Sequence, residues 1–301
     1  MWRFADGLRG HENQSDGLIE ALGARTQVAV HTIETPRARR LVTAWRTLLA
    51  ADTASLPSPD LLIGAGSTTH LPMLAARHRR GGRVVVLMKP SLPLVWFDLV
   101  VAPAHDRVPA KDNVLVTRGA INRVRASAAK NPRQGLMLIG GPDRRHGWEP
   151  LALEGQIATI AARHPEVRWC AASSRRTPEG FLSRLRALRL ANLETVEVAD
   201  VDADWLPRTL ATAATVWVTE DSVSMLYEAL TAGAATGLLE LPKPNGRAVR
   251  APLEGDSIVE GSATPFDAWE RGAHLAPPRT PLDEAGRCAD WILQRWPALA
   301  D

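Results

Sequence analysis

The chain has 301 residues, of which 45% are hydrophobic and 23% are charged, and its net charge is +3. These proportions are ordinary for a globular protein and exclude disorder, a collagen repeat or a coiled coil for the chain as a whole. The length indicates two domains or one large domain.

The two cysteines, Cys170 and Cys288, form no CxxC pair. They exclude a disulfide scaffold and a thiolate zinc site, and they favour a reducing compartment. The best candidate for a membrane span, residues 84–103, is interrupted by Lys89, Asp98 and two prolines, so no span is expected. The N-terminus lacks the apolar core of a signal peptide. We therefore expect a cytoplasmic protein.

The charge is unevenly distributed along the chain. Residues 1–130 have a net charge of +8, whereas residues 131–301 have −5. A basic first half predicts an anionic partner, such as a phosphate or an acidic membrane face. Scattered surface arginine is the alternative, because the chain has 32 Arg and only 4 Lys. No basic run has interleaved aromatic residues, so nucleic acid is not an expected partner.

The first half alternates short apolar runs with helical patterns. Parallel strands that are buried on both faces typically give such runs. Strands are predicted at 2–5, 27–33, 61–63, 83–88, 98–102 and 114–117, and helices at about 13–23, 37–51 and 69–80.

A polar stretch of small residues at 126–134 (ASAAKNPRQ) is interpreted as an interdomain linker. The alternation then restarts. Strands are predicted at 135–139, 167–172, 195–198, 215–219 and 236–241, and helices at about 149–164, 178–190, 204–213 and 222–232. Residues 242–280 are rich in Pro and Gly and resist assignment, and a last helix is expected at about 282–296.

Two consecutive β-α series predict an α/β fold with two Rossmann-like domains that face a cleft. We expect the domains at 1–130 and 131–280, with residues 281–301 forming a C-terminal helix that packs back on the first domain. Ligands of parallel sheets bind at the carboxyl ends of the strands, so the chemistry is expected in the loops that follow strands.

The first such loop, residues 6–14, has the sequence DGLRGHENQ. Gly7 and Gly10 permit a tight turn close to a ligand, and a helix begins just beyond. The imidazole of His11 at this turn can accept a proton from a hydroxyl group near neutral pH. The alternative is that His11 only caps the helix.

Two later loops of the first half give weaker signals. Residues 64–70 (GAGSTTH) hold half of a dinucleotide fingerprint, but they are interpreted as a tight turn before a helix with a Ser/Thr cap. Lys89 follows a predicted strand, where an ammonium group can bind a carboxylate or a phosphate, or simply face solvent.

In the second half, arginines follow two predicted strands. The loop GGPDRRHGW (140–148) suits a phosphate or an interdomain contact. Arg175, Arg176 and Thr177 lie between a strand and a helix, where two guanidiniums beside a helix N-terminus can hold a diphosphate. Exposed arginines beside a capped helix are the alternative.

The segment 219–229 (TEDSVSMLYEA) passes from a strand into a helix near Ser222. Ser222 and Ser224 lie at the helix N-terminus, where free N–H groups attract phosphate oxygens. The spacing of Asp221, Ser224 and Glu228 predicts one helical face, on which Glu228 can accept both hydroxyls of a ribose. A capping Ser/Asp pair and a buried Glu are the alternative.

No metal site is predicted. The segment DVDAD at 200–204 has the DxD spacing of metal-dependent sugar transferases, but it fails as a calcium loop. It is interpreted as solvated acids, with Asp204 capping the next helix.

Seven segments occur in one order along the chain: DGLRGHENQ, GAGSTTHLP, MKPSLPLVWFD, VTRGAIN, LIGGPDRRHGW, SSRRTP and VTEDSVSMLYEALTAG. Over residues 1 to about 241 this pattern resembles the ELM1-like family, also described as the mitochondrial fission ELM1 family. That family includes plant mitochondrial fission proteins and bacterial members regarded as glycosyltransferases of lipopolysaccharide outer-core synthesis. The chain resembles the bacterial members. The family usually has DGKPGHENQ in the first of these segments. This chain has Leu8 in place of the lysine and Arg9 in place of the proline.

The resemblance implies a GT-B fold, with a nucleotide-sugar donor in the second domain and the acceptor in the first. It implies nucleotide binding by Arg175, Arg176, Thr177, Ser222, Ser224 and Glu228, to which the helical spacing adds Asp221. His11 matches the glycine-rich acceptor loop of glycosyltransferases similar to the peptidoglycan enzyme that adds N-acetylglucosamine to a lipid-linked acceptor. The acceptor-side residues are then Gly7, Gly10, Asn13, Gln14 and Lys89.

We therefore predict a metal-independent, inverting glycosyltransferase that needs no cofactor. Its partners are a nucleotide-sugar and an anionic lipid-linked or core-oligosaccharide acceptor, with peripheral contact between the basic first domain and the inner membrane. Two alternatives remain open. One is a nucleotide-sugar epimerase with Glu12, Asp98 and Asp221 as acids and bases. The other is a non-catalytic membrane-recruitment protein like the plant fission factors.

Overall fold

A computed structural model describes residues 1–35, 55–242, 261–279 and 282–299. The chain divides into two compact units, residues 1–123 with 283–301 and residues 124–282. None of the helices in the described ranges has the length and hydropathy that a bilayer crossing requires.

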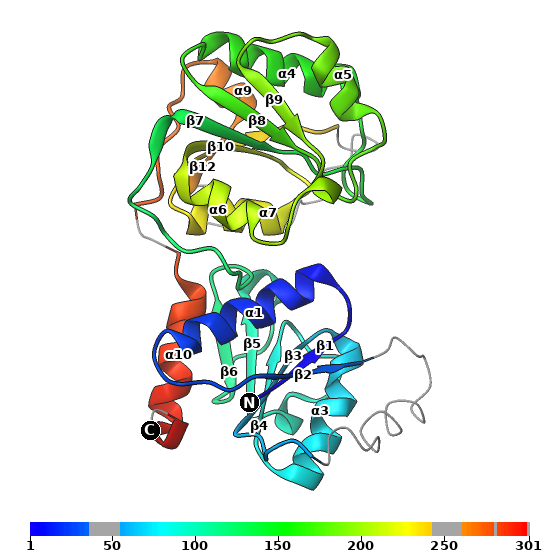
Figure 1. Ribbon diagram of the computed structural model, residues 1–301, viewed down its shortest axis with the longest axis vertical. Coiled ribbons are helices and arrows are strands. Elements are labelled where there is room, and N and C mark those ends of the chain that lie inside the picture. The colour runs from blue at the N-terminus through cyan, green and yellow to red at the C-terminus, as the bar shows by residue number, and fades with distance from the viewer. Residues whose placement is uncertain (36–54, 243–260, 280–281, 300–301) are drawn as a thin grey trace. The chain divides into compact units, whose positions relative to one another are not determined.

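The first unit contains a six-stranded parallel sheet with the strand order β2-β1-β3-β4-β5-β6 (Figure 1). The strands are β1 (Trp2–Ala5), β2 (His31–Glu34), β3 (Leu61–Ala65), β4 (Arg83–Leu87), β5 (Leu99–Pro103) and β6 (Val114–Thr117). Its central strands are buried on both faces, which explains why their sequences are continuous apolar runs.

Helices cover both faces of this sheet. Successive residues of β3 point to opposite sides, so Ile63 joins one apolar cluster and Leu62 the other. On the Ile63 side, α1 (Arg9–Gly23) lies beside α10 (Glu284–Arg295), as Figure 1 shows. On the Leu62 side lies α3 (Ser67–Arg80). The helix α10 buries Cys288, Ala289 and Ile292 in the first cluster.

An ionic network fixes the start of α10 to β6. The buried Glu284 accepts hydrogen bonds from the backbone N–H and the Nε of Arg118, both at 3.0 Å, and from Nη2 of Arg287 at 2.5 Å. Nη2 of Arg287 also donates to the carbonyl of Val116 at 2.6 Å. Burial alone would raise the pKa of Glu284, but these hydrogen bonds outweigh burial and hold the pKa below its ordinary value.

The second unit also contains a six-stranded parallel sheet, in the order β12-β11-β10-β7-β8-β9. Its strands are β7 (Asn131–Leu138), β8 (Arg168–Ala172), β9 (Leu193–Val196), β10 (Ala213–Thr219), β11 (Ala235–Leu239) and β12 (Ala263–Pro265). One face packs against α4 (Pro150–Arg163), α5 (Phe181–Ala187) and α9 (Phe266–Glu270). The other packs against α6 (Trp205–Thr212) and α7 (Val223–Thr231).

The predicted fold class is confirmed, because both units are Rossmann-like α/β sheets. Several element boundaries differ. The strand β7 begins at Asn131, inside the predicted linker, and β2 begins at His31 because residues 27–30 do not pair with β1. The unassigned range 242–280 contains β12 and α9. The predicted helix at 37–51 lies outside the described residues.

The units divide at 123/124 and 282/283, whereas the sequence placed the boundaries at 130/131 and 280/281.

We expect the variant Glu284→Gln to lower the free energy of unfolding at pH 7 by about 2 kcal/mol, because charge-assisted bonds to two guanidiniums are lost. Since the pKa of Glu284 is depressed in the folded state, its stabilisation is complete above the unfolded pKa of about 4.3 and is lost as pH falls through the folded pKa. Urea unfolding at pH 7 and at lower pH measures both effects. The exposed Glu179→Gln is the control. A difference that grows toward low pH would contradict this assignment.

Candidate active site

The carboxyl edge of the first sheet brings His11 next to a buried carboxylate. Asp6 directly follows β1, and Gly7, with φ of 74°, turns the chain into α1. Nδ1 of His11, in the first turn of α1, lies 2.8 Å from Oδ2 of Asp6. Because a carboxylate only accepts hydrogen bonds, Nδ1 has the proton and Nε2 of the neutral ring keeps its lone pair. The side chain of His11 is 23% exposed and that of Asp6 only 2%, so the imidazole is the group that can reach a ligand.

The loop after β3 completes the surroundings of this pair. Oγ1 of Thr68 donates to Oδ2 of Asp6 at 3.2 Å, and the N–H of Leu8 donates to Oδ1 at 3.1 Å. Gly66 has φ of 86°, and a Cβ at this position would lie 2.4 Å from Nδ1 of His11. A side chain at Gly66 would therefore displace the imidazole, so this loop determines where His11 lies.

Asp6, Gly66 and Thr68 are site residues that the sequence patterns did not identify. Residues 64–70 were interpreted as a turn, but Gly66 lies against His11 and Thr68 donates to Asp6. The missing signal was strand order. The strands β1 and β3 pair in parallel, with Phe4 opposite Gly64, so the loops that follow them meet at one edge.

The other predicted acceptor-side residues lie around the start of α1 and after β4. Gly10 is exposed beside His11, and Asn13 and Gln14 are half-buried further along α1. Lys89 has an exposed side chain, and its backbone N–H donates to Asp106 at 3.0 Å. Within the described residues, no hydrogen bond or ion pair joins the Lys89 side chain to His11.

A second histidine near this edge belongs to the core. His70, in α3, is 2% exposed, and burial lowers its pKa to about 4. Its ring packs edge-on against Phe97 with centroids 5.4 Å apart, and its Nδ1 lies 3.3 Å from Oγ of Ser91. His70 is neutral and cannot reach a ligand as His11 can.

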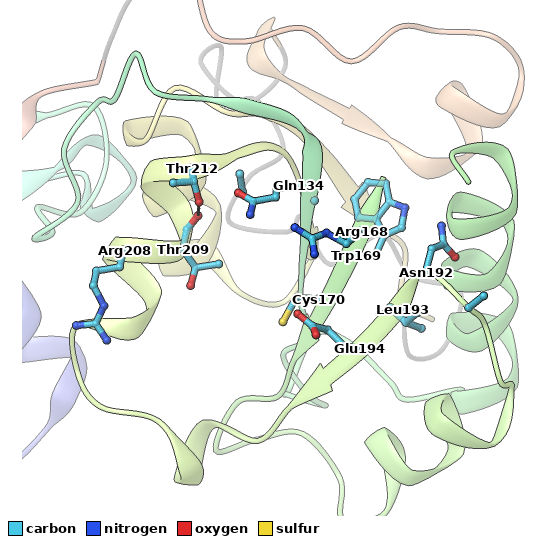
Figure 2. A pocket seen from close by; sticks show the side chains of 13 residues that line it. Gln134, Arg168, Trp169, Cys170, Asn192, Leu193, Glu194, Arg208, Thr209 and Thr212 are labelled. Atoms are coloured by element: carbon cyan, nitrogen blue, oxygen red, sulfur yellow. Dashed lines mark hydrogen bonds between the residues drawn. The ribbon is translucent and has the colours of Figure 1, made fainter. Parts of the chain in front are cut away.

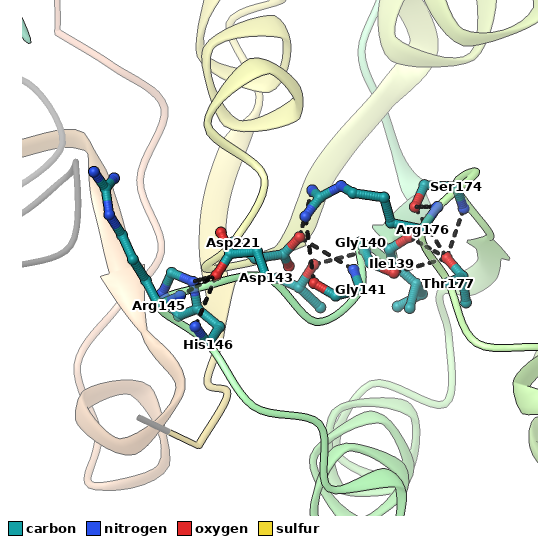
Figure 3. A network of polar contacts seen from close by, with 11 residues as sticks. Ile139, Gly140, Gly141, Asp143, Arg145, His146, Ser174, Arg176, Thr177 and Asp221 are labelled. Carbon is teal, nitrogen blue, oxygen red and sulfur yellow. Dashed lines mark hydrogen bonds and ion pairs between the residues drawn. The ribbon is translucent and has the colours of Figure 1, made fainter. Parts of the chain in front are cut away.

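At the carboxyl edge of the second sheet, the loop after β7 packs against the loop after β10 (Figure 3). The N–H of Gly140 donates to Oγ1 of Thr219 at 2.7 Å, and the N–H of Gly141 donates to Oδ2 of Asp221 at 3.1 Å. A Cβ on Gly140 would lie 2.2 Å from Oδ2 of Asp221, and one on Gly141 would lie 1.9 Å from the carbonyl oxygen of Arg176. Both positions therefore require glycine.

Asp221 holds Arg176 at this edge. Nη2 of Arg176 lies 2.5 Å from Oδ2 of Asp221, and Nη1 donates to the carbonyl of Gly141 at 3.3 Å. The Asp221 side chain is 0% exposed, whereas that of Arg176 is 44% exposed. Asp221 thus fixes one side of the guanidinium and has no surface of its own for a ligand, while the rest of the guanidinium faces solvent.

The neighbouring predicted residues differ in what they can offer. Oγ1 of Thr177 lies 2.8 Å and 2.7 Å from the carbonyls of Ile139 and Gly140, and it accepts from the N–H of Ser174 at 2.7 Å. The Thr177 hydroxyl therefore joins two loops. Arg175 is exposed.

The start of α7 differs from the prediction. The N–H of Ser222 donates to the carbonyl of Thr219 at 3.0 Å, which forms a turn before the helix. Asp221 lies in this turn and points to Arg176, so the predicted single face of Asp221, Ser224 and Glu228 does not form. Ser222 is the buried N-cap, Ser224 is exposed, and Glu228 is buried one turn deeper.

The loop after β7 adds two exposed guanidiniums. Asp143 accepts from the backbone N–H groups of Arg145 and His146, both at 2.7 Å, and from Nδ1 of His146 at 3.0 Å (Figure 3). Burial would raise the pKa of Asp143, but these bonds outweigh it and lower the pKa. The loops after β7 and β8 together present Arg144, Arg145, Arg175 and Arg176, although residues 131–301 are acidic in sum.

A polar cavity of about 450 Å³ lies elsewhere in the second unit, near the amino ends of β7, β8 and β9 (Figure 2). Cys170 lines it, and burial raises the pKa of this thiol to about 12, so the thiol is not a nucleophile at neutral pH. Within the described ranges no three His, Cys, Asp or Glu side chains are grouped to hold a metal ion. In the acidic segment 200–204, Asp202 pairs with Arg208 at 2.8 Å.

Comparison with protein families assigns the chain. The model of the family described as mitochondrial fission ELM1 matches residues 9–296, so the chain belongs to this family. No curated protein matches the chain.

Solved structures show the same fold at low sequence identity. A candidate UDP-N-acetylglucosamine 2-epimerase from Listeria monocytogenes gives a TM-score of 0.61 at 13% identity, covering 99% of this chain and 96% of that one. The UDP-GlcNAc 2-epimerase of Methanocaldococcus jannaschii gives 0.59 at 12% identity, covering 97% and 99%. The UDP-GlcNAc 2-epimerase of Neisseria meningitidis, bound to UDP-GlcNAc, gives a TM-score of 0.51 at 13% identity, covering 99% of each chain. The chain therefore has the GT-B-like fold of nucleotide-sugar enzymes.

Replacing Arg176 should lower the free energy of unfolding more than replacing Asp221. Arg176→Met leaves a fully buried carboxylate without its cation, and we expect the free energy of unfolding to fall by about 3 kcal/mol. Asp221→Asn leaves a half-exposed guanidinium that can turn to water. We expect the free energy of unfolding to fall by only about 1 kcal/mol. Urea unfolding measures both. Arg271→Met, in the exposed pair with Asp267, is the control and should change little. Equal losses in the two variants would contradict the described geometry.

Proposed function

We propose that this ELM1-family chain transfers a sugar from a nucleotide-diphosphate-sugar to a hydroxyl group of a cell-envelope glycan or lipid-linked acceptor, with the lipopolysaccharide core as the expected acceptor class. The proposal rests on one observation: Nδ1 of His11 lies 2.8 Å from a carboxylate that is itself buried. This contact gives a partly exposed imidazole a fixed acceptor atom, Nε2, at the edge where parallel sheets bind ligands. The reaction takes place in the cytoplasm.

The first unit binds the acceptor in this proposal. An acceptor hydroxyl donates to Nε2 of His11 and loses its proton to it as the oxygen attacks the anomeric carbon. The Asp6 carboxylate stabilises the imidazolium that results and keeps its ring in one orientation, while Thr68 orients the carboxylate. Asp6 is a positioning residue, because its buried side chain touches His11 and not the acceptor.

The second unit binds the donor. As the bond between the anomeric carbon and the diphosphate oxygen breaks, its electron pair passes to the diphosphate, which gains negative charge. Arg176 is held with part of its guanidinium free, and Arg175 is exposed beside it. Pre-oriented guanidiniums stabilise this charge without reorganising during the reaction. The proposal is therefore a metal-independent displacement with one base, which inverts the anomeric centre.

Epimerisation is the second candidate, and the positions of its three predicted acids favour transfer instead. Asp98 accepts from the N–H of Val84 at 2.8 Å and pairs with Arg77 at 3.3 Å, toward the amino end of β4. Asp221 is buried against Arg176. Of the three acids, Glu12 alone stays partly exposed at the His11 edge. The likeness to epimerases at 12–13% identity concerns the fold alone.

Calorimetry with UDP, GDP, ADP, CMP and their sugars tests the donor site. We expect one nucleotide diphosphate to bind, and Arg176→Met to weaken its affinity about 10- to 100-fold through loss of a charge-assisted contact. Arg271→Met should bind as the wild type does. If a folded protein binds none of these nucleotides, the transfer proposal is wrong and the non-catalytic recruitment role is favoured. Turnover of the bound donor without any acceptor would instead indicate the epimerase.

His11 is tested by transfer with the nucleotide-sugar that binds. We expect His11→Ala to lower the transfer rate about 100- to 10,000-fold with unchanged donor affinity, because only proton removal from the acceptor is lost. Asp6→Asn should lower the rate in the same direction, because the imidazolium loses its counter-charge. The exposed His78→Ala on the same unit is the control. Full transfer by His11→Ala would exclude this histidine as the base.

A further inference from the structure

One face of the second sheet has a cavity beside α6. The opposite face of β8 and β9 is covered by α4 and α5, where Trp169 joins the apolar cluster. On the near face α6 contacts β7 and β10. The cavity of about 450 Å³ is lined by this helix and by the starts of β7, β8 and β9 (Figure 2). A volume of this size suits a small molecule.

The strand register places four side chains on this face. Successive residues of a strand point to opposite sides, and Cys170 belongs to the apolar cluster on the α6 side, so Arg168 points the same way. In the parallel sheet Gln134 pairs with Arg168, and Glu194 pairs with Cys170. These four side chains therefore line one cavity although they come from three strands.

Two opposite charges in this cavity have no partner within the protein as described. Arg168 and Glu194 are both exposed, and no hydrogen bond or ion pair joins either side chain to another described group or to each other. Arg208 also lines the cavity, but both carboxylate oxygens of Asp202 hold its guanidinium, at 3.0 Å and 2.8 Å. Arg168 and Glu194 are therefore the charges of the described lining that a ligand can pair with.

Other side chains of the cavity add neutral groups. Cys170 is buried, and burial together with the charge of Glu194 raises the pKa of its thiol to about 12, so the thiol stays protonated. The hydroxyls of Thr209 and Thr212 donate to carbonyls of α6 at 2.8 Å and 3.2 Å, and their oxygens can still accept. The amide of Gln134 can both donate and accept.

We infer that this cavity binds a free α-amino acid, with its carboxylate on Arg168 and its ammonium group on Glu194. The planar guanidinium matches a carboxylate, because the two can form parallel N–H···O bonds. Glu194 would repel an anion that has no cationic group, and Arg168 would repel a simple cation. A neutral sugar would leave both charges unpaired. The hydroxyl and amide groups of the lining remain for the side chain of the amino acid.

The cavity is separate from the residues proposed to bind the donor. Arg168 begins β8, whereas Arg176 lies in the loop beyond the end of this strand. The five residues of β8 span about 13 Å. The inference therefore does not rest on the transfer reaction, and it can be tested without a nucleotide or an acceptor.

Calorimetry of the full chain with each of the standard L-amino acids tests this inference. We expect at least one to bind. Arg168→Gln and Glu194→Gln should each weaken its affinity at least about tenfold, because each removes a charge-assisted contact. Arg133→Gln and Glu179→Gln replace exposed residues outside the cavity, so these matched controls should bind as the wild type does. Thermal unfolding of each variant shows that loss of binding is not loss of fold.

Derivatives of the amino acid that binds assign the two charges. N-acetylation removes its ammonium group, and conversion to the amide removes its carboxylate. N-acetylation should weaken binding to the wild type about tenfold and change binding to Glu194→Gln little, and the amide should behave in the same way toward Arg168→Gln. The inference is overturned if no amino acid binds the folded chain, if the two charge variants bind as well as the wild type, or if N-acetylation weakens binding to Glu194→Gln as much as to the wild type. Tighter binding of inorganic phosphate than of any amino acid, lost in Arg168→Gln, would also overturn it.

Discussion

Parallel pairing of strands that are distant in sequence is the constraint on which the candidate residues of each unit depend. The pairing of β1 with β3 places the loop that contains Asp6 beside the loop that contains Gly66 and Thr68. The pairing of β7 with β10 places Gly141 beside Asp221. In each case a carboxylate from one loop is hydrogen-bonded by a group from the other. Neither His11 nor Arg176 would have a fixed position if the strand order were different.

Local sequence patterns were sufficient for the fold class because buried parallel strands have a composition that can be recognised without tertiary information. The apolar strand β4 has nearly its predicted bounds, and β6 has the predicted ones. The patterns failed where tertiary pairing decides the structure. The polar start of β7, from Asn131, is a strand because it pairs with β10 and not because of its own composition. The three-residue β12 is too short to give a period.

The same distinction applies to the site. Loops that follow strands could be found in the sequence, and so could His11 and Arg176. The direction of each side chain could not, because it depends on which loop lies opposite. Asp221 and Thr177 have residue types suited to a nucleotide, but the structure uses both to join loops. Asp6 looked like part of a turn, and it became a candidate only when its contact with His11 was seen.

The carboxylates show why a fold shared with epimerases does not decide the chemistry. Asp98 binds the start of β4, Asp221 binds Arg176, and Glu284 binds α10 to β6. Each is occupied by a structural partner, and a carboxylate in such a contact is a poor general base because its oxygens already accept hydrogen bonds from that partner. Asp6 is also buried, but its partner is a histidine with one nitrogen still available. Reversible epimerisation needs acids and bases on both sides of a sugar, whereas transfer needs one base and a stabilised leaving group. The proposed transfer reaction assigns these two roles to His11 and Arg176.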